Sequence, residues 1–321
     1  MARSPLLLGA AVVTAAAGIA LAVAWAPDRP LASLVPRYAP PPSVLRPIDG
    51  VTVHLRDEGP RTDPTPVLLL HGTSASLHTW EGWVRAIAPE RRVITVDLPG
   101  FGLSGRFADD DYSAAHTARF LFTVLDSLGV RRAVVGGNSL GGRIAWAMAA
   151  MDTSRVAALI LVDAAGYPSQ ASSVPIGFRL ARTPGLRRLA ARLLPRSVIA
   201  SSLRNVYGDP TRVTDALIDR YYDLALREGN RAALLARFSA VPRAADTLAV
   251  RALRMPTLIL WGGRDRLIPP TDADRFARDI VGSRVVRFDV LGHVPHEEDP
   301  AATVVPVLAF LRENTTAVPS R

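Results

Sequence analysis

A serine enclosed by glycines limits what this chain can fold into. The segment AVVGGNSLGGRIAWAMAA places four glycines around Ser139, between an apolar run and an alanine-rich run. The apolar run predicts a buried strand over 132–137, and the alanine-rich run predicts a helix over 140–151. In a G-x-S-x-G pattern the serine occupies a strained turn between strand and helix, and side chains at Gly137 and Gly141 would collide with nearby backbone. The pattern therefore predicts a serine raised above one edge of a parallel sheet.

The rest of the chain alternates between strand and helix patterns. This alternation indicates an α/β fold with a mostly parallel sheet covered by helices on both faces. Strands are predicted over 51–59, 66–72, 92–100, 156–166, 256–263 and 284–292, and helices over 113–128, 211–227, 230–239 and 301–314. No convincing strand pattern occurs within 167–253. We therefore expect a body formed by 48–166 and 254–321, interrupted by a mainly helical insertion.

The first residues differ from the rest of the chain. Residues 5–25 are apolar apart from Thr14, which is long enough for a transmembrane helix and longer than the usual core of a cleaved signal peptide. We therefore predict that residues 1–26 are an uncleaved membrane anchor, with a cleaved signal segment as the alternative. Arg3 favours a cytoplasmic amino terminus, which places the body outside the cytoplasm. Seven prolines within 27–47 predict an extended spacer between the membrane and the body.

Composition narrows the chemistry. The chain contains no cysteine, so it has no disulfide framework, no thiolate metal site and no cysteine nucleophile. Its formal net charge is +9, and arginine supplies all of the Lys+Arg total. Because these arginines are scattered and no nucleic-acid-binding pattern is visible, we attribute the charge to an arginine-rich composition and predict no nucleic acid partner. We expect neither a metal nor an organic cofactor, and the sequence leaves the oligomeric state open.

A serine hydroxyl needs a base, and the base needs an acid that holds its tautomer. We predict that His293 is the base, because it lies in the first turn after the last predicted strand. His296 is the competitor, placed nearer to a helix start. Asp265 is the predicted acid because its strand should neighbour the histidine strand, and Asp163 is the alternative. The order Ser139, Asp265, His293 along the chain fits one known arrangement of such a triad.

Two backbone amides are candidates for stabilising an oxyanion. The amide of Leu140 lies at a predicted helix N-terminus directly after the serine. The second donor is expected from the loop in LLLHGTSAS, where we favour the amide of Thr73, with Ser74 as its neighbouring alternative. His71 in the same loop is interpreted as a buried histidine that organises the loop, not as a base.

The motifs HGTSASLHTWEGW, DLPGFGLSG, GNSLGG, WGGRDRLIP and GHVPHEEDP together resemble the α/β-hydrolase fold family in order and spacing. The resemblance covers about residues 48–315. The body looks most like the microbial branch that includes meta-cleavage-product hydrolases and related esterases. The resemblance implies that the insertion 167–253 is a lid shaping an acyl pocket. It also implies that Asp97 and Ser104 order a loop.

These features predict a serine hydrolase that cleaves an ester or similar acyl bond through an acyl-enzyme on Ser139. Haloalkane dehalogenases and epoxide hydrolases of this fold use a carboxylate nucleophile, so the serine argues against both activities. Carbon–carbon hydrolases often carry a glycine-rich segment where this chain has TSAS, and a tryptophan where it has Val294, so these departures argue against a ring-cleavage substrate. Two further alternatives are a cofactor-free perhydrolase or haloperoxidase, and a non-catalytic binding protein tethered to the membrane.

Apolar residues of the predicted lid bear on the substrate. They include Ile176, Phe178, Leu180, Leu193 and Leu194. These side chains favour a small-molecule ester with an apolar acyl or aromatic group. Alternatively, they only pack the lid on the body.

Overall fold

The body is built around one eight-stranded sheet. The computed structural model describes residues 24–168, 170–183, 192–239 and 247–315. The strands are β1 (Val44–Ile48), β2 (Val51–Glu58), β3 (Val67–Leu70), β4 (Val93–Val96), β5 (Ala133–Asn138), β6 (Val156–Val162), β7 (Thr257–Gly262) and β8 (Arg284–Phe288). Their spatial order is β1-β2-β4-β3-β5-β6-β7-β8. The β1–β2 and β2–β4 pairs are antiparallel and the other five pairs are parallel, so the expected mostly parallel sheet is confirmed.

The central strands are continuous apolar runs because helices cover both of their faces. Every residue of β3, β4, β5, β6 and β7 is buried. Successive side chains point to opposite faces. In β3, Leu68 and Leu70 join one hydrophobic cluster, whereas Val67 and Leu69 join the other. The sheet is therefore held from both sides, and its strand ends are rigid supports for a site.

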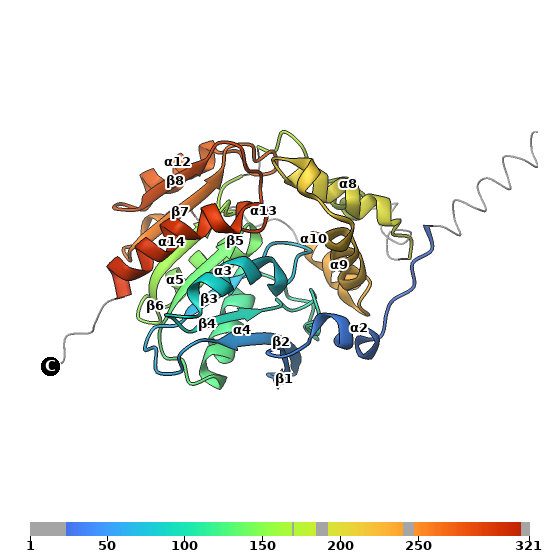
Figure 1. Cartoon of the computed structure of the whole chain (residues 1–321), viewed down its shortest axis with the longest axis horizontal. Coiled ribbons are helices and arrows are strands. Elements are labelled where there is room, and N and C mark those ends of the chain that lie inside the picture. Colours follow the sequence, from blue (N-terminus) through green and yellow to red (C-terminus); the bar gives the residue numbers. More distant parts are fainter. Residues whose placement is uncertain (1–23, 169, 184–191, 240–246, 316–321) are drawn as a thin grey trace, which may run out of the picture.

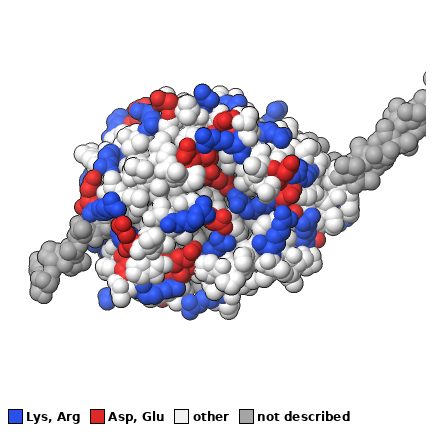
Figure 2. Space-filling view, viewed as in Figure 1, with Lys and Arg blue, Asp and Glu red and all other residues white. Residues whose placement is uncertain are grey.

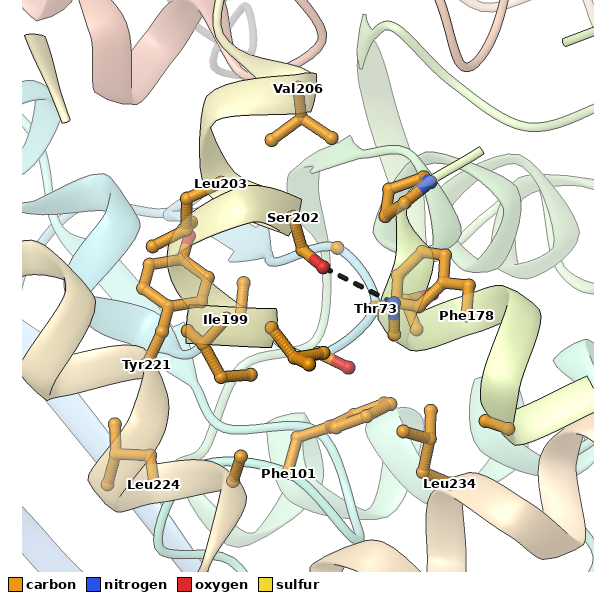
Figure 3. A pocket seen from close by; sticks show the side chains of 18 of the residues that line it. Thr73, Phe101, Phe178, Ile199, Ser202, Leu203, Val206, Tyr221, Leu224 and Leu234 are labelled. Atoms are coloured by element: carbon orange, nitrogen blue, oxygen red, sulfur yellow. Dashed lines mark hydrogen bonds between the residues drawn. The ribbon is translucent and has the colours of Figure 1, made fainter. Parts of the chain in front are cut away.

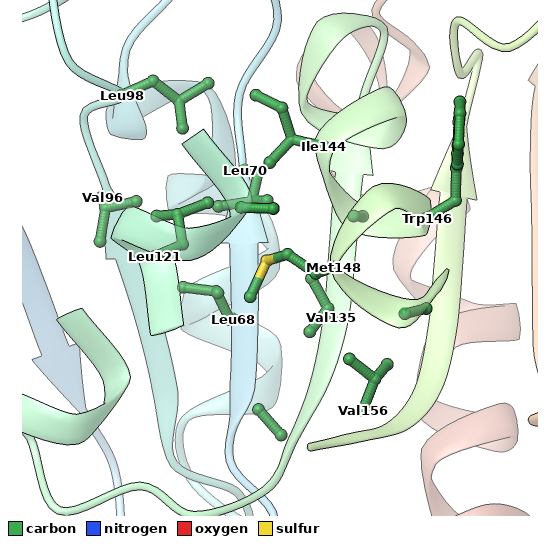
Figure 4. Close-up of a cluster of buried hydrophobic side chains, with 14 of the residues drawn as sticks. Leu68, Leu70, Val96, Leu98, Leu121, Val135, Ile144, Trp146, Met148 and Val156 are labelled. Carbon is green, nitrogen blue, oxygen red and sulfur yellow. The ribbon is translucent and has the colours of Figure 1, made fainter. Parts of the chain in front are cut away.

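Helices form a layer on each face of the sheet (Figure 1). One layer contains α3 (Glu81–Ile87) and α14 (Pro300–Thr315), and the other contains α4 (Ala114–Ser127), α5 (Leu140–Met151) and α12 (Thr271–Asp279). Figure 4 shows Leu121 of α4 and Met148 of α5 packed among strand residues on the face of the sheet that this second layer covers. Each fully buried side chain of this size contributes about 1.5–3 kcal/mol.

The chain between β6 and β7 forms helices and, over its described residues, no strand. These are α6 (Ile176–Arg182), α8 (Arg196–Val206), η3 (Pro210–Arg212), α9 (Asp215–Ala225), α10 (Asn230–Ser239) and α11 (Thr247–Arg251). The expected helix over 211–227 is split, because Thr214 caps α9 by accepting a hydrogen bond from the Leu217 amide. In Figure 1, α8, α9 and α10 lie together at one end of the sheet.

The predicted spacer over 27–47 is wrong as an extended segment. It contains α2 (Leu31–Tyr38) and the edge strand β1, and α2 lies beside the insertion (Figure 1). Leu34 and Tyr38 of α2 are buried against Leu103 and Leu224. Pro30 precedes the helix, and Pro36 lies inside it, where the missing amide hydrogen removes one helical hydrogen bond without ending this eight-residue helix. Residues 27–47 are thus part of the folded body.

The predicted anchor lies outside the described residues as far as residue 23. Among the residues that are described, no helix is both long enough and apolar enough to cross a membrane. Residues 24–29, the first residues that the structure describes, form backbone hydrogen bonds with the insertion. Ala24 accepts a hydrogen bond from the Leu194 amide at 3.0 Å, and the Arg29 amide donates to Leu226 at 2.6 Å.

A polar network on α9 holds α2 in place. The buried Asp223 carboxylate accepts hydrogen bonds from Arg29 at 2.7 Å, from Arg37 at 3.1 Å and from the Tyr38 hydroxyl at 2.6 Å. Burial and this hydrogen bond raise the pKa of Tyr38, so its hydroxyl remains a donor. One carboxylate therefore links residues 29–38 to the insertion.

Charges on the face drawn in Figure 2 are intermixed, with arginines beside acidic residues. Ion pairs such as Arg196 with Asp215, and Arg212 with Asp299, lie at the surface of the insertion. Such pairing agrees with our attribution of the positive net charge to an arginine-rich composition.

We expect Asp223→Ala to lower the free energy of unfolding by about 2 kcal/mol, because it leaves buried donors without their charged acceptor. Urea denaturation measures this change. Asp215→Ala on the same helix is the control. It breaks an exposed ion pair with Arg196 and should cost less than about 1 kcal/mol. Equal losses in the two variants would contradict a special role for Asp223.

Candidate active site

Four neighbouring parallel strands deliver the candidate residues to one edge of the sheet. In sheet order, Ser139 follows β5, Asp163 follows β6, Asp265 lies in the loop after β7, and His293 lies in the loop after β8. Since these strands are parallel, their carboxyl ends meet at the same edge, where α/β folds place ligands. Residues far apart in the sequence thus become neighbours.

Ser139 occupies the strained turn that its glycines predict. Its φ of 54° and ψ of −114° lie outside the helical range, and α5 begins at the next residue. A Cβ at Gly137 would clash with the backbone of Gly141, and one at Gly141 would clash with the Leu70 carbonyl. Only glycine fits at either position. The turn is fastened by the amides of Arg143 and Ala165, which both donate to the Ser139 carbonyl at 3.0 Å.

His293 is hydrogen-bonded to the predicted acid. Its Nδ1 lies 2.6 Å from Asp265 Oδ2, and both side chains are buried. The other oxygen, Oδ1, accepts from the Leu267 amide at 2.7 Å and from the Ile268 amide at 2.9 Å, which fixes the carboxylate plane. With Nδ1–H directed at Asp265, Nε2 is left to act as a base. His293 and Ser139 line the same pocket.

The alternative acid, Asp163, is fully buried beside this pair. Its Oδ1 accepts from the Gly262 amide at 2.9 Å, but the His293 Nδ1 hydrogen bond goes to Asp265. Ligand atoms of Asp163, Asp265 and His293 all lie within 4.8 Å of one another. A cation there would have to compete with the histidine–aspartate hydrogen bond, so the cluster fits acid–base chemistry better than metal binding.

His296 and His71, two other histidines of the motifs, serve structural roles. His296 lies near the start of α13 (Pro295–Glu298). Its ring is stacked on Trp80 with 4.0 Å between the ring centroids, and its Nε2 is hydrogen-bonded to Thr79 Oγ1. Burial lowers the pKa of His296 well below its usual value. His71 donates from Nδ1 to the Gly72 carbonyl and accepts the Leu98 amide at Nε2, so it is a neutral histidine that organises its loop, as expected.

Both predicted oxyanion donors border the nucleophile. Thr73 lies in the loop between β3 and η1 (Leu77–Trp80) and lines the pocket with Ser139. Leu140 is the first residue of α5, where amides lack helical partners. Neither amide donates to another backbone carbonyl of the described chain. Ser74 has a φ of 62°, which strains the loop next to Thr73. The oxyanion roles stay predictions.

Asp97 and Ser104 order the loop in front of the site. Asp97 accepts the Leu77 and Leu103 amides and a hydrogen bond from His54, while the Ser104 hydroxyl donates to the Asp97 carbonyl. Burial opposes ionisation of Asp97, but His54 beside it holds its pKa well below the usual range. These contacts agree with the structural role that the resemblance implies.

The pocket is mostly apolar (Figure 3). Ser139 and His293 line it from the body, and helices α6, α8, α9 and α10 supply most of the remaining wall. Its empty volume, counted out to the open mouth, is about 1360 Å³. The insertion residues in the wall include Phe178, Leu180, Leu193, Leu194, Ile199, Leu203, Val206, Tyr221, Leu224 and Leu234. Ile176 does not line the pocket and is exposed, contrary to expectation.

Two residues that the motifs did not single out hold the histidine loop. Asn138 donates from Nδ2 to the His293 carbonyl at 2.9 Å and so joins the serine turn to the histidine loop. Glu298 accepts the amides of Gly292, Gly208 and Asp209 at 2.8–2.9 Å. The only sequence signal for either was its place inside a motif.

Comparison with known proteins agrees with this architecture. The profile of the alpha/beta hydrolase fold matches residues 65–300. The 2-hydroxymuconate semialdehyde hydrolase of Pseudomonas sp. (strain CF600) is 32% identical over 279 residues, covering 84% of this chain and 93% of that protein. The fold and the site define an α/β protein with a serine turn at the sheet edge. The chain belongs to the α/β hydrolase fold family, close to the meta-cleavage-product hydrolases.

Solved structures give the same result. A thermophilic esterase from Thermogutta terrifontis superposes with a TM-score of 0.70 at 27% identity, covering 85% of this chain and 99% of that chain. The meta-cleavage product hydrolase from Pseudomonas fluorescens IP01 gives a TM-score of 0.71 at 24% identity, covering 84% and 97%. The second likeness is one of fold alone. The protein is therefore a hydrolase of the α/β fold.

We expect Glu298→Gln to loosen the histidine loop. The glutamine NH2 group would face backbone N–H groups that now donate to a carboxylate oxygen of Glu298. The free energy of unfolding should fall by about 2 kcal/mol, and kcat by at least about tenfold. Urea denaturation and steady-state kinetics measure the two effects. The control Glu313→Gln, on an exposed ion pair with Arg284, should change neither. Normal kcat in Glu298→Gln would contradict this role.

Proposed function

We propose that this protein is a serine hydrolase that cleaves a carboxylic ester through an acyl-enzyme on Ser139. The observation that carries the proposal is the His293–Asp265 hydrogen bond beside the strained serine turn, with both His293 and Ser139 in one apolar pocket. A perhydrolase or a haloperoxidase would use the same residues, and peroxide-dependent halogenation is the assay that separates them.

The proposed reaction has two halves. His293 Nε2 takes the Ser139 proton as Oγ bonds to the substrate carbonyl carbon, and the amides of Thr73 and Leu140 stabilise the oxyanion by about 3 kcal/mol each. The imidazolium, stabilised by Asp265, then protonates the leaving alcohol as its bond to carbon breaks. In the second half His293 takes a proton from water, the water oxygen attacks the acyl carbon, and Ser139 is released with its proton restored.

The pocket supports an apolar acyl group. Phe178, Leu203 and Leu224 from three helices of the insertion face the space in Figure 3. Val294, where carbon–carbon hydrolases often carry tryptophan, also lines this space and leaves it wider beside His293. The structural likeness to an esterase at 27% identity points the same way.

Carbon–carbon bond hydrolysis is the second candidate. The observation that favours it is the 32% identity to a 2-hydroxymuconate semialdehyde hydrolase over most of both chains. The two activities share the serine, the histidine and the aspartate. They differ in whether an alcohol or a carbon fragment leaves.

We expect wild-type protein to hydrolyse chromogenic esters of medium acyl chain length and to be labelled by a fluorophosphonate probe. Ser139→Ala should abolish labelling and lower kcat by at least about a thousandfold. Ser202→Ala, which changes a hydroxyl of the same pocket, is the matched control and should keep both. Faster turnover of a meta-cleavage product than of any ester would favour the second candidate. No labelling of the wild type would favour a non-catalytic binding protein.

We also propose that the apolar segment up to residue 23 tethers the protein to a membrane, with the body outside the cytoplasm. The support is the sequence of residues 5–25, which has no charged side chain. Because residues 24–29 pair with the insertion, the segment removed in a test should end at residue 23.

Removal of residues 1–23 should release an active protein from the membrane fraction with kcat unchanged. Removal of residues 1–39 should in addition lower stability, because it deletes the partners of Asp223. Sedimentation with membranes, ester turnover and thermal unfolding measure these effects. Persistent membrane association of the shorter deletion would contradict the tether.

A further inference from the structure

Asp163 is a buried acid that the proposed reaction does not use. It has no exposed surface, its φ is 43°, and it is not among the residues of the pocket wall. Its Oδ1 accepts one hydrogen bond, from the Gly262 amide. Its Oδ2 is sealed from solvent and has no donor among the described groups. An ionised carboxylate is costly to bury with so little support.

Asp265, by contrast, is well supplied with donors. His293 and the amides of Leu267 and Ile268 all donate to it. A carboxylate offers about four acceptor sites, so Asp265 retains room for one more donor. Asp163 and Asp265 belong to the cluster whose ligand atoms lie within 4.8 Å. The two carboxyl groups also lie in hydrogen-bond contact with each other. Because neither ionised group has a donor, this contact requires a proton, and a proton on Asp163 would supply it.

Electrostatics places the proton on Asp163. The ionisable groups that face it from neighbouring elements are Asp265 after β7, His293 after β8 and Glu298 of α13. Burial and the adjacent Asp265 charge raise the pKa of Asp163 well above its usual range, and Glu298 adds to the effect. Of the two aspartates, Asp163 also has the fewer donors to support a negative charge.

We propose that Asp163 is a neutral carboxylic acid that donates a hydrogen bond to the Asp265 carboxylate and so positions the acid that holds His293. The inference rests on the proposed roles of Ser139, Asp265 and His293. Asp163 is a positioning residue, because it acts through Asp265. Asp163 is itself held by the Gly262 amide, which lies at the end of β7, the strand before the Asp265 loop.

Neutrality of Asp163 has a consequence for the base. With one proton shared between the two carboxyl groups, the pair carries a single negative charge beside the imidazole. A second negative charge there would stabilise the imidazolium further and so oppose its return to the free base that the reaction needs. Asp163 thus orients Asp265 without adding its own charge to the site.

Two substitutions test the proposal through the pH dependence of ester hydrolysis. Asp163→Asn keeps an acceptor for Gly262 and a donor for Asp265, and it removes no charge if Asp163 is neutral. We expect it to retain kcat within about threefold, with the acidic limb of the kcat/KM profile unmoved. Asp163→Ala loses the donor, so kcat should fall by at least about tenfold with KM little changed. Asp265→Asn should be far more damaging than Asp163→Asn.

A direct readout comes from infrared spectroscopy at neutral pH. The carbonyl stretch that Asp163 contributes as a buried protonated carboxyl should be present in the wild type and absent in Asp163→Asn. The same spectra do not depend on turnover, so they test the protonation state even in inactive variants.

The outcomes separate this proposal from the proposed function. If Asp163→Asn moves the acidic limb to lower pH by about one unit, Asp163 is ionised in the wild type and the proposal is wrong. Stoichiometric bound metal, lost in Asp163→Asn, would also overturn it. If Ser139→Ala leaves hydrolysis intact, the proposed function itself fails. Serine-dependent hydrolysis together with a displaced limb in Asp163→Asn refutes the positioning role alone.

Discussion

The hydrogen bond between His293 and Asp265 is the interaction on which the rest of the site depends. It exists because β7 and β8 are neighbours in a parallel sheet, so the loops after them begin side by side. The adjoining strands β5 and β6 bring Ser139 and Asp163 to the same edge. Strands β5, β6 and β7 are fully buried between helices, which keeps the loops that follow them from shifting where they leave the sheet. The chemistry is therefore assembled by strand order and not by local sequence.

The insertion supports this site as well as lining its pocket. The His293 amide donates to the Val206 carbonyl at 2.7 Å, and Glu298 ties the amide of Gly292 to those of Gly208 and Asp209. The insertion is held in turn by α2 through Asp223. A continuous set of contacts thus runs from residues 29–38 through α9 and α8 to the histidine loop. A change in the amino-terminal segment bears on the pocket even though the segment lies outside it.

The sequence predicted the parts of the fold that depend on short-range constraints. The serine turn could be predicted because any side chain at Gly137 or Gly141 would clash with backbone close by, so the glycines mark the turn in the sequence. The helix over 140–151 and most strands followed from their apolar periodicity. The segment 27–47 was misjudged because its prolines suggest an extended chain, whereas its partner Asp223 lies far away in sequence. No local pattern reveals such a contact.

The same contrast applies to the two acids. Asp163 and Asp265 both follow buried strands, and the sequence favours Asp265 only through the expected order of the strands, without any known contact. In the structure Nδ1 of His293 is hydrogen-bonded to Asp265, whereas Asp163 accepts a hydrogen bond from the Gly262 amide. Asn138 and Glu298 could not be identified as supports because their partners are backbone groups of distant loops. Motifs indicate which residues meet, but hydrogen bonds decide what each residue does.

A crystal structure of the protein with a phosphonate bound in the pocket would test the proposed site most directly. We predict a bond from phosphorus to Ser139 Oγ, with the phosphoryl oxygen about 2.7–3.1 Å from the amides of Thr73 and Leu140. His293 Nε2 should face the leaving-group position while Nδ1 remains on Asp265. A phosphonate attached to another residue, or an oxygen directed away from both amides, would contradict it.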